Sequence, residues 1–520
     1  MMEALRLQAD APAVPAPAGR RLLEESESFT RARLEALAPE RRVLLSFTNR
    51  VRLDFALTWA HHVRSLAMSN WMIGATDAPA LEGLRRYRLP RFDMQTNLPQ
   101  GEWPWGSPSF KALGPHKIEL IYKCLLWDVE VIIADIDALV LREPFAYMAR
   151  WPDASFLTTS DHLGNTTADG GLEDHGGIHT AFNIGYMFFR KSALPLVEEW
   201  RKTILEKPTV RWDQGEFNRL ARKQWQPRRK DGLSDPRLFW SYENRVIGGV
   251  LPISLFCGGH NYFVSQFPQR AGVQPYSIHT TYQYGGAPGK RHRLREAKVW
   301  IDPPAYYNPS GLLVYPPDVP RSLIYPAGGM TTKGHIALIK HQLKQIKQAL
   351  ALARYLDRTL ILPPVVCGYD KAWYPLASGR ARGVFPGTHA WAVPIFNCPL
   401  DHFLEPASLR APVREYSFLS NPRTPASVTS SVASVELGAQ HTLAALKLKY
   451  ASTKVLNVTN LPSVDVLARL LTKPQAKEFR RLFGNVGGSW CCAPNQDRSQ
   501  GMPSAAYFRL INNQGGRGLG

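Results

Sequence analysis

Short apolar runs alternate with helical patterns along the N-terminal half of the chain. Between the runs, apolar residues recur at helical spacing, and strands that alternate with helices are typical of a parallel sheet in an α/β domain. A fourth apolar run follows the segment 182–185. The predicted strands are 43–47, 71–75, 129–134 and 186–189, and the predicted helices are 53–66 and 118–127.

The pattern changes around residues 301–329, where Pro, Gly and Tyr dominate, which predicts a domain junction. A long helical pattern over 335–356 then leads into a strand-like segment at 358–364, and this indicates a second α/β unit. We therefore predict three parts: an N-terminal tail and helix over 1–40, an α/β domain over 41–305, and a smaller, partly irregular C-terminal α/β domain over 306–520.

Charge and composition restrict the class of partner. The 520 residues include 63 Lys and Arg against 43 Asp and Glu, a net charge of +20, which favours an anionic ligand. The basic residues are dispersed without a polybasic arm, so we predict no nucleic-acid binding. No run of about 18 apolar residues occurs, so we predict no transmembrane segment in this chain. The six cysteines are too few for a disulfide scaffold and lack zinc-type spacing.

The strongest local signal for chemistry is the sequence Asp135-Ile136-Asp137, directly after a buried strand. Ligands of α/β sheets bind beyond the carboxyl ends of strands. Two carboxylates spaced i, i+2 at such an end can approach one divalent cation, and Mg²⁺ or Mn²⁺ held in this way accepts the diphosphate of a nucleotide substrate. An Asp-x-Asp in a solvated turn is the simpler alternative.

A phosphatase of the haloacid-dehalogenase type is a rival hypothesis, because its nucleophilic Asp lies in a similar strand-end motif. That motif usually continues with Thr or Val, where this chain has Leu139, and it usually follows the first strand of its domain. Here at least two predicted strands precede Asp135, which disfavours the phosphatase.

Three further segments fit a sugar-nucleotide site. Asn183, near a glycine before a predicted strand, can offer an amide to a sugar hydroxyl. Asp213 can cap a helix that begins there, but capping leaves the adjacent Gln214 unexplained. His279 is a possible third metal ligand, followed by a Gly-rich loop that ends in Lys290 and could bind phosphate.

Taken together, these segments resemble the nucleotide-diphospho-sugar transferases of glycosyltransferase family seventy-seven, and among them the plant and green-algal extensin arabinosyltransferases. The similarity runs from about residue 43 to about residue 437. It rests on separated motifs that recur in order: 135–137, 182–185, 212–214, 279–296, 342–351, 358–368 and 397–402.

That resemblance implies a GT-A type, Rossmann-like catalytic domain, a UDP-sugar donor, Mn²⁺ or Mg²⁺, and retention of anomeric configuration. It implies an acceptor that is an arabinosylated, hydroxyproline-rich glycoprotein of the cell wall, and a location in the Golgi lumen. Carried over by position, the metal ligands are Asp135, Asp137 and His279. The donor-binding residues are Thr48, Asn49, Asp77, Lys117, Asp161, Asn183, Gly289 and Lys290, and the pair beside the anomeric carbon is Asp213 and Gln214.

A chain that keeps the fold but only binds a sugar or glycoprotein remains an alternative to the enzyme. The intact Asp-x-Asp, His279 and Lys290 disfavour it. The predicted C-terminal domain resembles the opening of a Rossmann-like half of GT-B fucosyltransferases. It carries no complete second set of catalytic residues, which favours a role as scaffold or in acceptor recognition.

Overall fold

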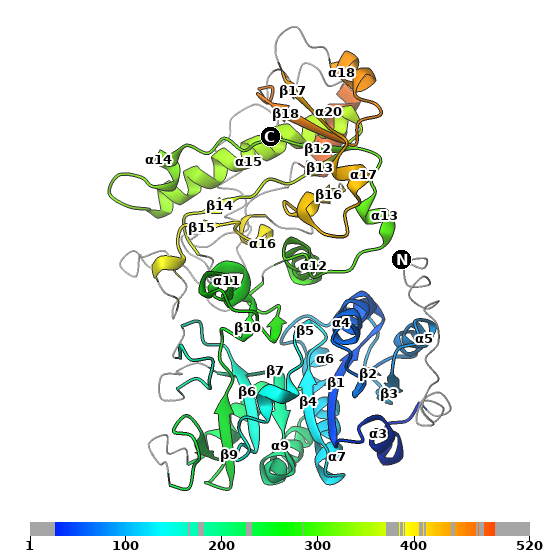
Figure 1. Cartoon of the computed structure of the whole chain (residues 1–520), viewed down its shortest axis with the longest axis vertical. Coiled ribbons are helices and arrows are strands. Elements are labelled where there is room, and N and C mark those ends of the chain that lie inside the picture. The colour runs from blue at the N-terminus through cyan, green and yellow to red at the C-terminus, as the bar shows by residue number, and fades with distance from the viewer. Residues whose placement is uncertain are drawn as a thin grey trace. The chain divides into compact units, whose positions relative to one another are not determined.

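The computed structural model describes residues 27–164, 167–174, 181–224, 231–283, 285–370, 384, 388, 390–404, 409, 412–437, 443–463, 466 and 473–483. The tail up to residue 26 and the Cys491-Cys492 pair lie outside this part of the chain. Contacts divide the chain into two compact units (Figure 1). The described residues of the N-terminal unit fall within 27–262 and 267–281, and those of the C-terminal unit are 263–266 and the described residues from 282 onward.

An eight-stranded sheet forms the centre of the N-terminal unit, in the order β3-β2-β1-β4-β7-β6-β9-β8. A separate small sheet has the order β10-β11-β5. The strands are β1 (Arg42–Thr48), β2 (Trp71–Ala75), β3 (Arg91–Asp93), β4 (Glu130–Ala134), β5 (Ala138–Val140), β6 (Phe156–Ser160), β7 (Phe182–Phe189), β8 (Phe239–Ser241), β9 (Val246–Val250), β10 (Phe256–Gly258) and β11 (Ser277–His279). The helices are α3 (Arg31–Leu37), α4 (Leu53–Ser65), α5 (Ala78–Arg86), α6 (Pro108–Lys111), α7 (Gly114–Leu126), α8 (Phe145–Met148), α9 (Leu194–Glu206), α10 (Asp213–Ala221) and α11 (Phe267–Ala271).

The large sheet is mixed, which corrects the prediction of a parallel sheet. Strands β1 to β4 pair in parallel, but β7 pairs antiparallel with both β4 and β6. Parallel neighbours need a long crossover, usually a helix. The described residues between β6 and β7 contain no helix, so the chain returns in the opposite direction. Strand β7 also begins at Phe182, four residues before the predicted start at residue 186.

Buried apolar side chains explain why β1, β4 and β7 lie centrally. Every residue of β7 is buried, and so are all but the first residues of β1 and β4. Continuous apolar strands of this kind are covered on both faces. Aromatic residues fill much of this core, with Phe217 of α10 packing against Trp200 of α9. The carboxyl end of β4 is therefore held on a rigid support.

The C-terminal unit contains a five-stranded parallel sheet with the order β16-β13-β12-β18-β17, which agrees with a second, smaller α/β unit. A disulfide joins Cys367 and Cys398, beside the short β14–β15 pair, which sequence analysis did not foresee. The strands are β12 (Leu312–Val314), β13 (Thr359–Ile361), β14 (Val366–Cys367), β15 (Ile395–Phe396), β16 (Val413–Arg414), β17 (Val432–Glu436) and β18 (Val455–Thr459). The helices are α12 (Gly286–Glu296), α13 (Pro304–Tyr307), α14 (Arg321–Ile324), α15 (Thr332–Leu356), α16 (Leu400–Phe403), α17 (Ala426–Thr429), α18 (Leu443–Lys449) and α20 (Lys473–Phe483).

The division between the two units falls at Thr281 and Tyr282, earlier in the chain than the predicted boundary at 305. Helix α12 belongs to the C-terminal unit because Arg293, on its buried face, bonds the Asp401 carboxylate at 2.7 Å. Both side chains are fully buried, so this ion pair fixes the helix against α16. In the part of the chain that the structure describes, no helix has the length and apolar character needed to cross a membrane.

Candidate active site

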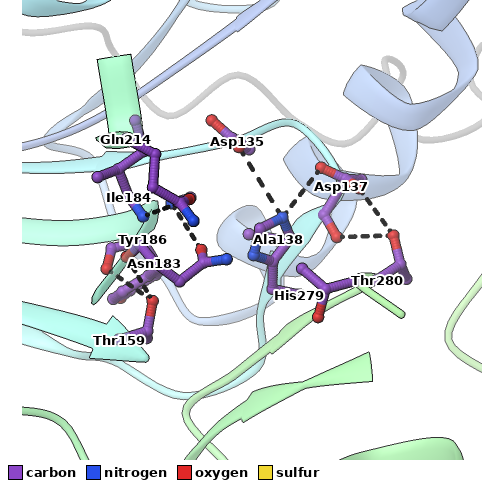
Figure 2. Close-up of polar contacts among 12 residues, drawn as sticks. Asp135, Asp137, Ala138, Thr159, Asn183, Ile184, Tyr186, Gln214, His279 and Thr280 are labelled. Carbon is purple, nitrogen blue, oxygen red and sulfur yellow. Dashed lines mark hydrogen bonds and ion pairs between the residues drawn. The ribbon is translucent and has the colours of Figure 1, made fainter. Parts of the chain in front are cut away.

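The Asp-x-Asp segment forms a tight turn between strands of two different sheets. The backbone N–H of Ala138 donates to the carbonyl of Asp135 at 2.8 Å, so the chain leaves β4 and immediately enters β5 (Figure 2). The Asp135 N–H donates to the carbonyl of Gly185 on β7, also at 2.8 Å. The turn is thereby fixed at the carboxyl end of β4.

His279 reaches the turn because β11 pairs antiparallel with β5, which aligns His279 with Ala138. Its Nε2 atom lies 3.8 Å from Oδ2 of Asp135 and 3.6 Å from Oδ1 of Asp137. One ligand atom from each of the three residues lies within 4.8 Å of the other two. Residues more than 140 positions apart in sequence thus form the group that the sequence predicted.

Thr280, which sequence analysis missed, holds the second carboxylate in place. Its hydroxyl donates to Oδ2 of Asp137 at 2.9 Å, and its backbone N–H donates to the Asp137 carbonyl at 3.2 Å. The contacts leave Oδ1 of Asp137 as the oxygen that approaches His279. A hydroxyl that orients a metal-binding carboxylate is a common outer-shell contact.

Gly185 makes room for the His279 ring. A Cβ atom at this position would lie 2.1 Å from Cε1 and 2.6 Å from Nδ1 of His279. Any other residue would therefore displace the ring or the central strand β7. The sequence shows a glycine here, but the reason for it depends on the close approach of β11 to β7, which sequence alone does not reveal.

Lys117 supplies the positive charge next to the turn. Its ammonium donates to Oδ1 of Asp135 at 2.8 Å and to the carbonyl of Ile184 at 2.6 Å. The lysine side chain is only 3% exposed, so this pair is poorly screened by water. Lys117 therefore contributes to the site by fixing Asp135.

A polar network connects Asn183, Asp161 and Gln214 on the same side of the sheet. Asn183 and Gln214 each donate an amide N–H to the Asp161 carboxylate, at 2.8 and 3.1 Å. Figure 2 shows Asn183 and Gln214 beside the Asp-x-Asp turn. Burial raises the pKa of Asp161, while these hydrogen bonds and the nearby His279 oppose that rise. The network presents amides and a carboxylate, the groups that bind sugar hydroxyls.

Asp213 is the first residue of α10, and the N-cap position belongs to Trp212, so the predicted capping role is wrong. Its carboxylate accepts the N–H of Gln214 at 2.9 Å, and burial raises its pKa against the opposing charge of Lys117. Gly114, at the start of α7, packs closely against it: an added Cβ would lie 2.9 Å from the Cβ of Asp213. Asp213 and Gln214 thus lie next to each other on one short helix, but Asp213 packs against Gly114 while Gln214 bonds Asp161.

The predicted nucleoside-binding residues lie at the ends of β1 and β2. The Thr48 carbonyl accepts from the backbone N–H of Thr76 at 2.9 Å, which ties the two strand ends together. Asn49 is buried and donates to the carbonyl of Gly101 at 2.9 Å. Asp77 caps α5 by accepting from Ala80 N–H at 2.7 Å. Capping and loop contacts account for Asp77 and Asn49 structurally.

Gly289 and Lys290 belong to the C-terminal unit. They lie in the first turns of α12, which begins at Gly286, so the predicted Gly-rich loop is wrong for these two residues. Pro288 is compatible with this start because a helix tolerates proline in its first turn. Phosphate binding by Gly289 and Lys290 stays a prediction.

The group of Asp135, Asp137 and His279 fits a divalent cation. Two carboxylate oxygens and one imidazole nitrogen suit Mn²⁺ or Mg²⁺ better than soft, thiolate-binding metals. The distances from His279 Nε2 to Oδ1 of Asp137, 3.6 Å, and to Oδ2 of Asp135, 3.8 Å, are consistent with ligands that share one ion after small side-chain movements. Without an ion, the two neighbouring carboxylates would repel each other, and Lys117 pairs with Asp135.

An α/β domain with a mixed sheet, an Asp-x-Asp turn at the end of β4 and a neighbouring histidine is typical of glycosyltransferases of the GT-A type. Residues 66–294 match the family model Nucleotid_trans, nucleotide-diphospho-sugar transferase. The chain is 35% identical over 509 residues to Arabinosyltransferase XEG113 of Arabidopsis thaliana, an alignment that covers 90% of this chain and 76% of that protein. The chain therefore belongs to the nucleotide-diphospho-sugar transferase family, among relatives of this arabinosyltransferase, and is a glycosyltransferase.

Solved structures show weaker similarity. Mouse xyloside xylosyltransferase 1 is 13% identical with a TM-score of 0.27, covering 46% of this chain and 98% of that chain. The glycosyltransferase GlyE of Streptococcus pneumoniae is 10% identical with a TM-score of 0.30, covering 81% and 91%. Similarity at this level supports no conclusion about substrate.

Proposed function

We propose that this protein is a divalent-metal-dependent, retaining glycosyltransferase that moves L-arabinofuranose from a UDP-sugar to an arabinosylated, hydroxyproline-rich glycoprotein. The observation that carries the proposal is the convergence of Asp135, Asp137 and His279 beside the Asn183–Asp161–Gln214 network. The similarity to an Arabidopsis thaliana arabinosyltransferase supports the choice of sugar.

In this proposal Asp135, Asp137 and His279 hold Mn²⁺, or Mg²⁺ in its place. The bound ion would supply charge stabilisation for the diphosphate leaving group. Lys117 and Thr280 keep the two carboxylates in position. The family resemblance carries Lys290 over as a residue that binds diphosphate oxygens. The ends of β1 and β2, with Thr48, Asn49 and Asp77, bind the nucleoside.

The remaining residues orient the two sugars. Asn183 and Asp161 bind hydroxyls of the donor sugar, while Gln214 and Asp213 position the acceptor and stabilise the reacting geometry. Gln214 is suited to this because its side chain is held at both ends, by the Ile184 N–H at 3.4 Å and by Asp161 at 3.1 Å. Groups that are already ordered lose little entropy when they bind substrate.

We also propose that the protein works in the secretory pathway, in the Golgi lumen. The Cys367–Cys398 disulfide supports this, since disulfides form and persist in oxidising compartments. The family relationship to an arabinosyltransferase is compatible with the same location.

The experiment that tests the function measures UDP release from UDP-arabinofuranose, UDP-galactose and UDP-xylose, with an arabinosylated hydroxyproline peptide as acceptor. Each reaction is run with Mn²⁺ and with chelator, and the product mass is recorded. We expect chelator-sensitive release from UDP-arabinofuranose, with one pentose added to the peptide. Donor binding without turnover would favour a protein that only binds sugar, and phosphate release without any UDP-sugar would favour the phosphatase.

A further inference from the structure

The loop over residues 98–107, which we name the tryptophan loop, carries an exposed indole next to the candidate active site. Trp105 is 74% exposed, and its ring contacts Trp212 at a centroid distance of 5.7 Å and an interplanar angle of 81°. Trp212 immediately precedes Asp213 and Gln214 on α10. The exposed ring thus lies within the N-terminal unit and contacts the residue that directly precedes the proposed acceptor-positioning pair.

Fixed contacts hold the tryptophan loop in place. Asn49, at the end of β1, donates to the Gly101 carbonyl at 2.9 Å, and Arg52 pairs with Glu102 at 2.5 Å. The Trp103 indole N–H donates to the Pro99 carbonyl at 2.8 Å. These contacts anchor the first half of the loop to the strand end that is proposed to bind the nucleoside.

The segment that follows the loop leads back to the same site. The Ser107 hydroxyl accepts from Phe110 N–H at 3.2 Å and caps α6. Helix α7 then begins at Gly114, which packs against Asp213. The loop therefore lies between two contacts with site residues, Asn49 on one side and Asp213 on the other.

Leaving an indole in water is unfavourable, because its large apolar surface contributes binding free energy only when it is covered. An edge-to-face contact uses at most one face of each ring, so Trp105 keeps a face open. The C–H face of a sugar ring is of matching size, and its hydroxyls can reach the polar groups of the site. A proline-rich helix instead docks in a groove lined by several aromatic rings, whereas the contact described for Trp105 is with one ring, that of Trp212.

We propose that Trp105, supported by Trp212, is the acceptor subsite, on which the terminal sugar of the acceptor glycan stacks. This inference rests on the proposed function and adds the residue that recognises the acceptor. Trp105 acts by binding, and no bond is made or broken on it.

The test compares Trp105→Ala, Trp105→Phe and a matched control, Trp240→Ala. Trp240 lies on β8, the edge strand of the large sheet, and its indole N–H donates to the Asp231 carbonyl. We expect Trp105→Ala to raise the KM for the arabinosylated hydroxyproline peptide at least tenfold, with a change below twofold in the KM for the donor. Trp105→Phe, which keeps an aromatic face, restores most of the affinity, and Trp240→Ala does not raise the acceptor KM.

Binding of the same peptide in the presence of UDP and Mn²⁺, followed by titration calorimetry, gives a readout that does not depend on turnover. If Trp105→Ala binds the peptide with a tenfold weaker Kd, the subsite is supported even when the transfer assay shows no activity. Failure of the transfer assay would count against the proposed function alone. Unchanged peptide binding and unchanged acceptor KM in Trp105→Ala, with active wild-type enzyme, would overturn the inference. The inference would also be overturned if the unglycosylated hydroxyproline peptide bound as tightly as the arabinosylated one and its binding also depended on Trp105. The ring would then recognise the peptide and not the sugar.

Discussion

The glycine beneath the His279 ring offers a sharp test of the metal site. In Gly185→Ala the new methyl carbon would lie 2.1 Å from Cε1, 2.6 Å from Nδ1 and 2.9 Å from Nε2 of His279. Carbon atoms in contact are normally about 3.5 Å apart, so the ring must retreat by more than about 1 Å. Rotation of the ring alone does not suffice, because three of its atoms are too close.

Strand β7 cannot easily move instead. The Gly185 N–H donates to Oδ1 of Asn183 at 2.9 Å, and the Gly185 carbonyl accepts from Asp135 N–H at 2.8 Å. A misplacement of about 1 Å at a catalytic group costs roughly 100-fold in rate. We therefore expect kcat/KM to fall about 100-fold and the Kd for Mn²⁺ to rise about tenfold or more, with overpacking costing about 1–3 kcal/mol of folding stability.

The assay combines Mn²⁺ titration calorimetry with UDP release, and Gly215→Ala is the matched control. Gly215 is exposed on α10, and a Cβ there would meet its nearest neighbour, Trp212, at an ordinary 3.5 Å. Alanine in a helix is favoured over glycine by about 0.5–1 kcal/mol, so this variant should be at least as stable as the wild type. Wild-type Mn²⁺ affinity and turnover in Gly185→Ala would refute the reasoning.

Two further predictions concern stability. Burial raises the pKa of Asp161 in the folded protein above its unfolded value of about 3.9. Between these two pKa values the folded state binds more protons than the unfolded state. The free energy of unfolding that this carboxyl contributes therefore falls as pH rises. Asp161→Asn should therefore gain stability relative to wild type between pH 4 and pH 7 in urea unfolding with chelator, and a pH-independent difference would contradict this. For the Cys367–Cys398 disulfide, with a sequence separation of 31, loop entropy predicts a loss of about 3–4 kcal/mol on reduction. Reductant should lower the midpoint of urea unfolding of the C-terminal unit in wild type but not in Cys398→Ser. An unchanged wild-type midpoint would contradict a stabilising role for the disulfide.

Local patterns were sufficient to predict strands β1, β2 and β4 and helices α4 and α7 of the N-terminal unit. The run over 71–75 is strand β2, and the helical pattern over 53–66 corresponds to α4 at Leu53–Ser65. Both depend on local spacing of apolar residues, which the sequence displays directly. The direction of β7 depends instead on which strand it pairs with, and no local pattern encodes that partner.

In the candidate active site, too, local patterns predicted some residues, while the others depend on tertiary contacts. Asp135 and Asp137 could be identified because a buried strand precedes them. The residues alone made His279 one possible ligand, and the family resemblance then assigned it to the metal. The contributions of Thr280 and Gly185 arise from the pairing of β11 with β5 and its approach to β7. Tertiary contacts of this kind leave no periodic signal in the sequence. The disulfide likewise joins residues whose proximity depends on the β14–β15 pair.

The central claim is that metal bound at the Asp-x-Asp turn is required for sugar transfer, and Asp137→Asn tests it most directly. The measurement follows the mass of the arabinosylated hydroxyproline peptide with UDP-arabinofuranose, after chelation and after Mn²⁺ is added back. Asp153→Asn, at an exposed loop position, is the control. We predict that Mn²⁺ restores pentose addition in wild type and Asp153→Asn, while Asp137→Asn stays folded, binds Mn²⁺ weakly and adds no sugar. Wild-type transfer by Asp137→Asn, or transfer that persists in chelator, would contradict the account.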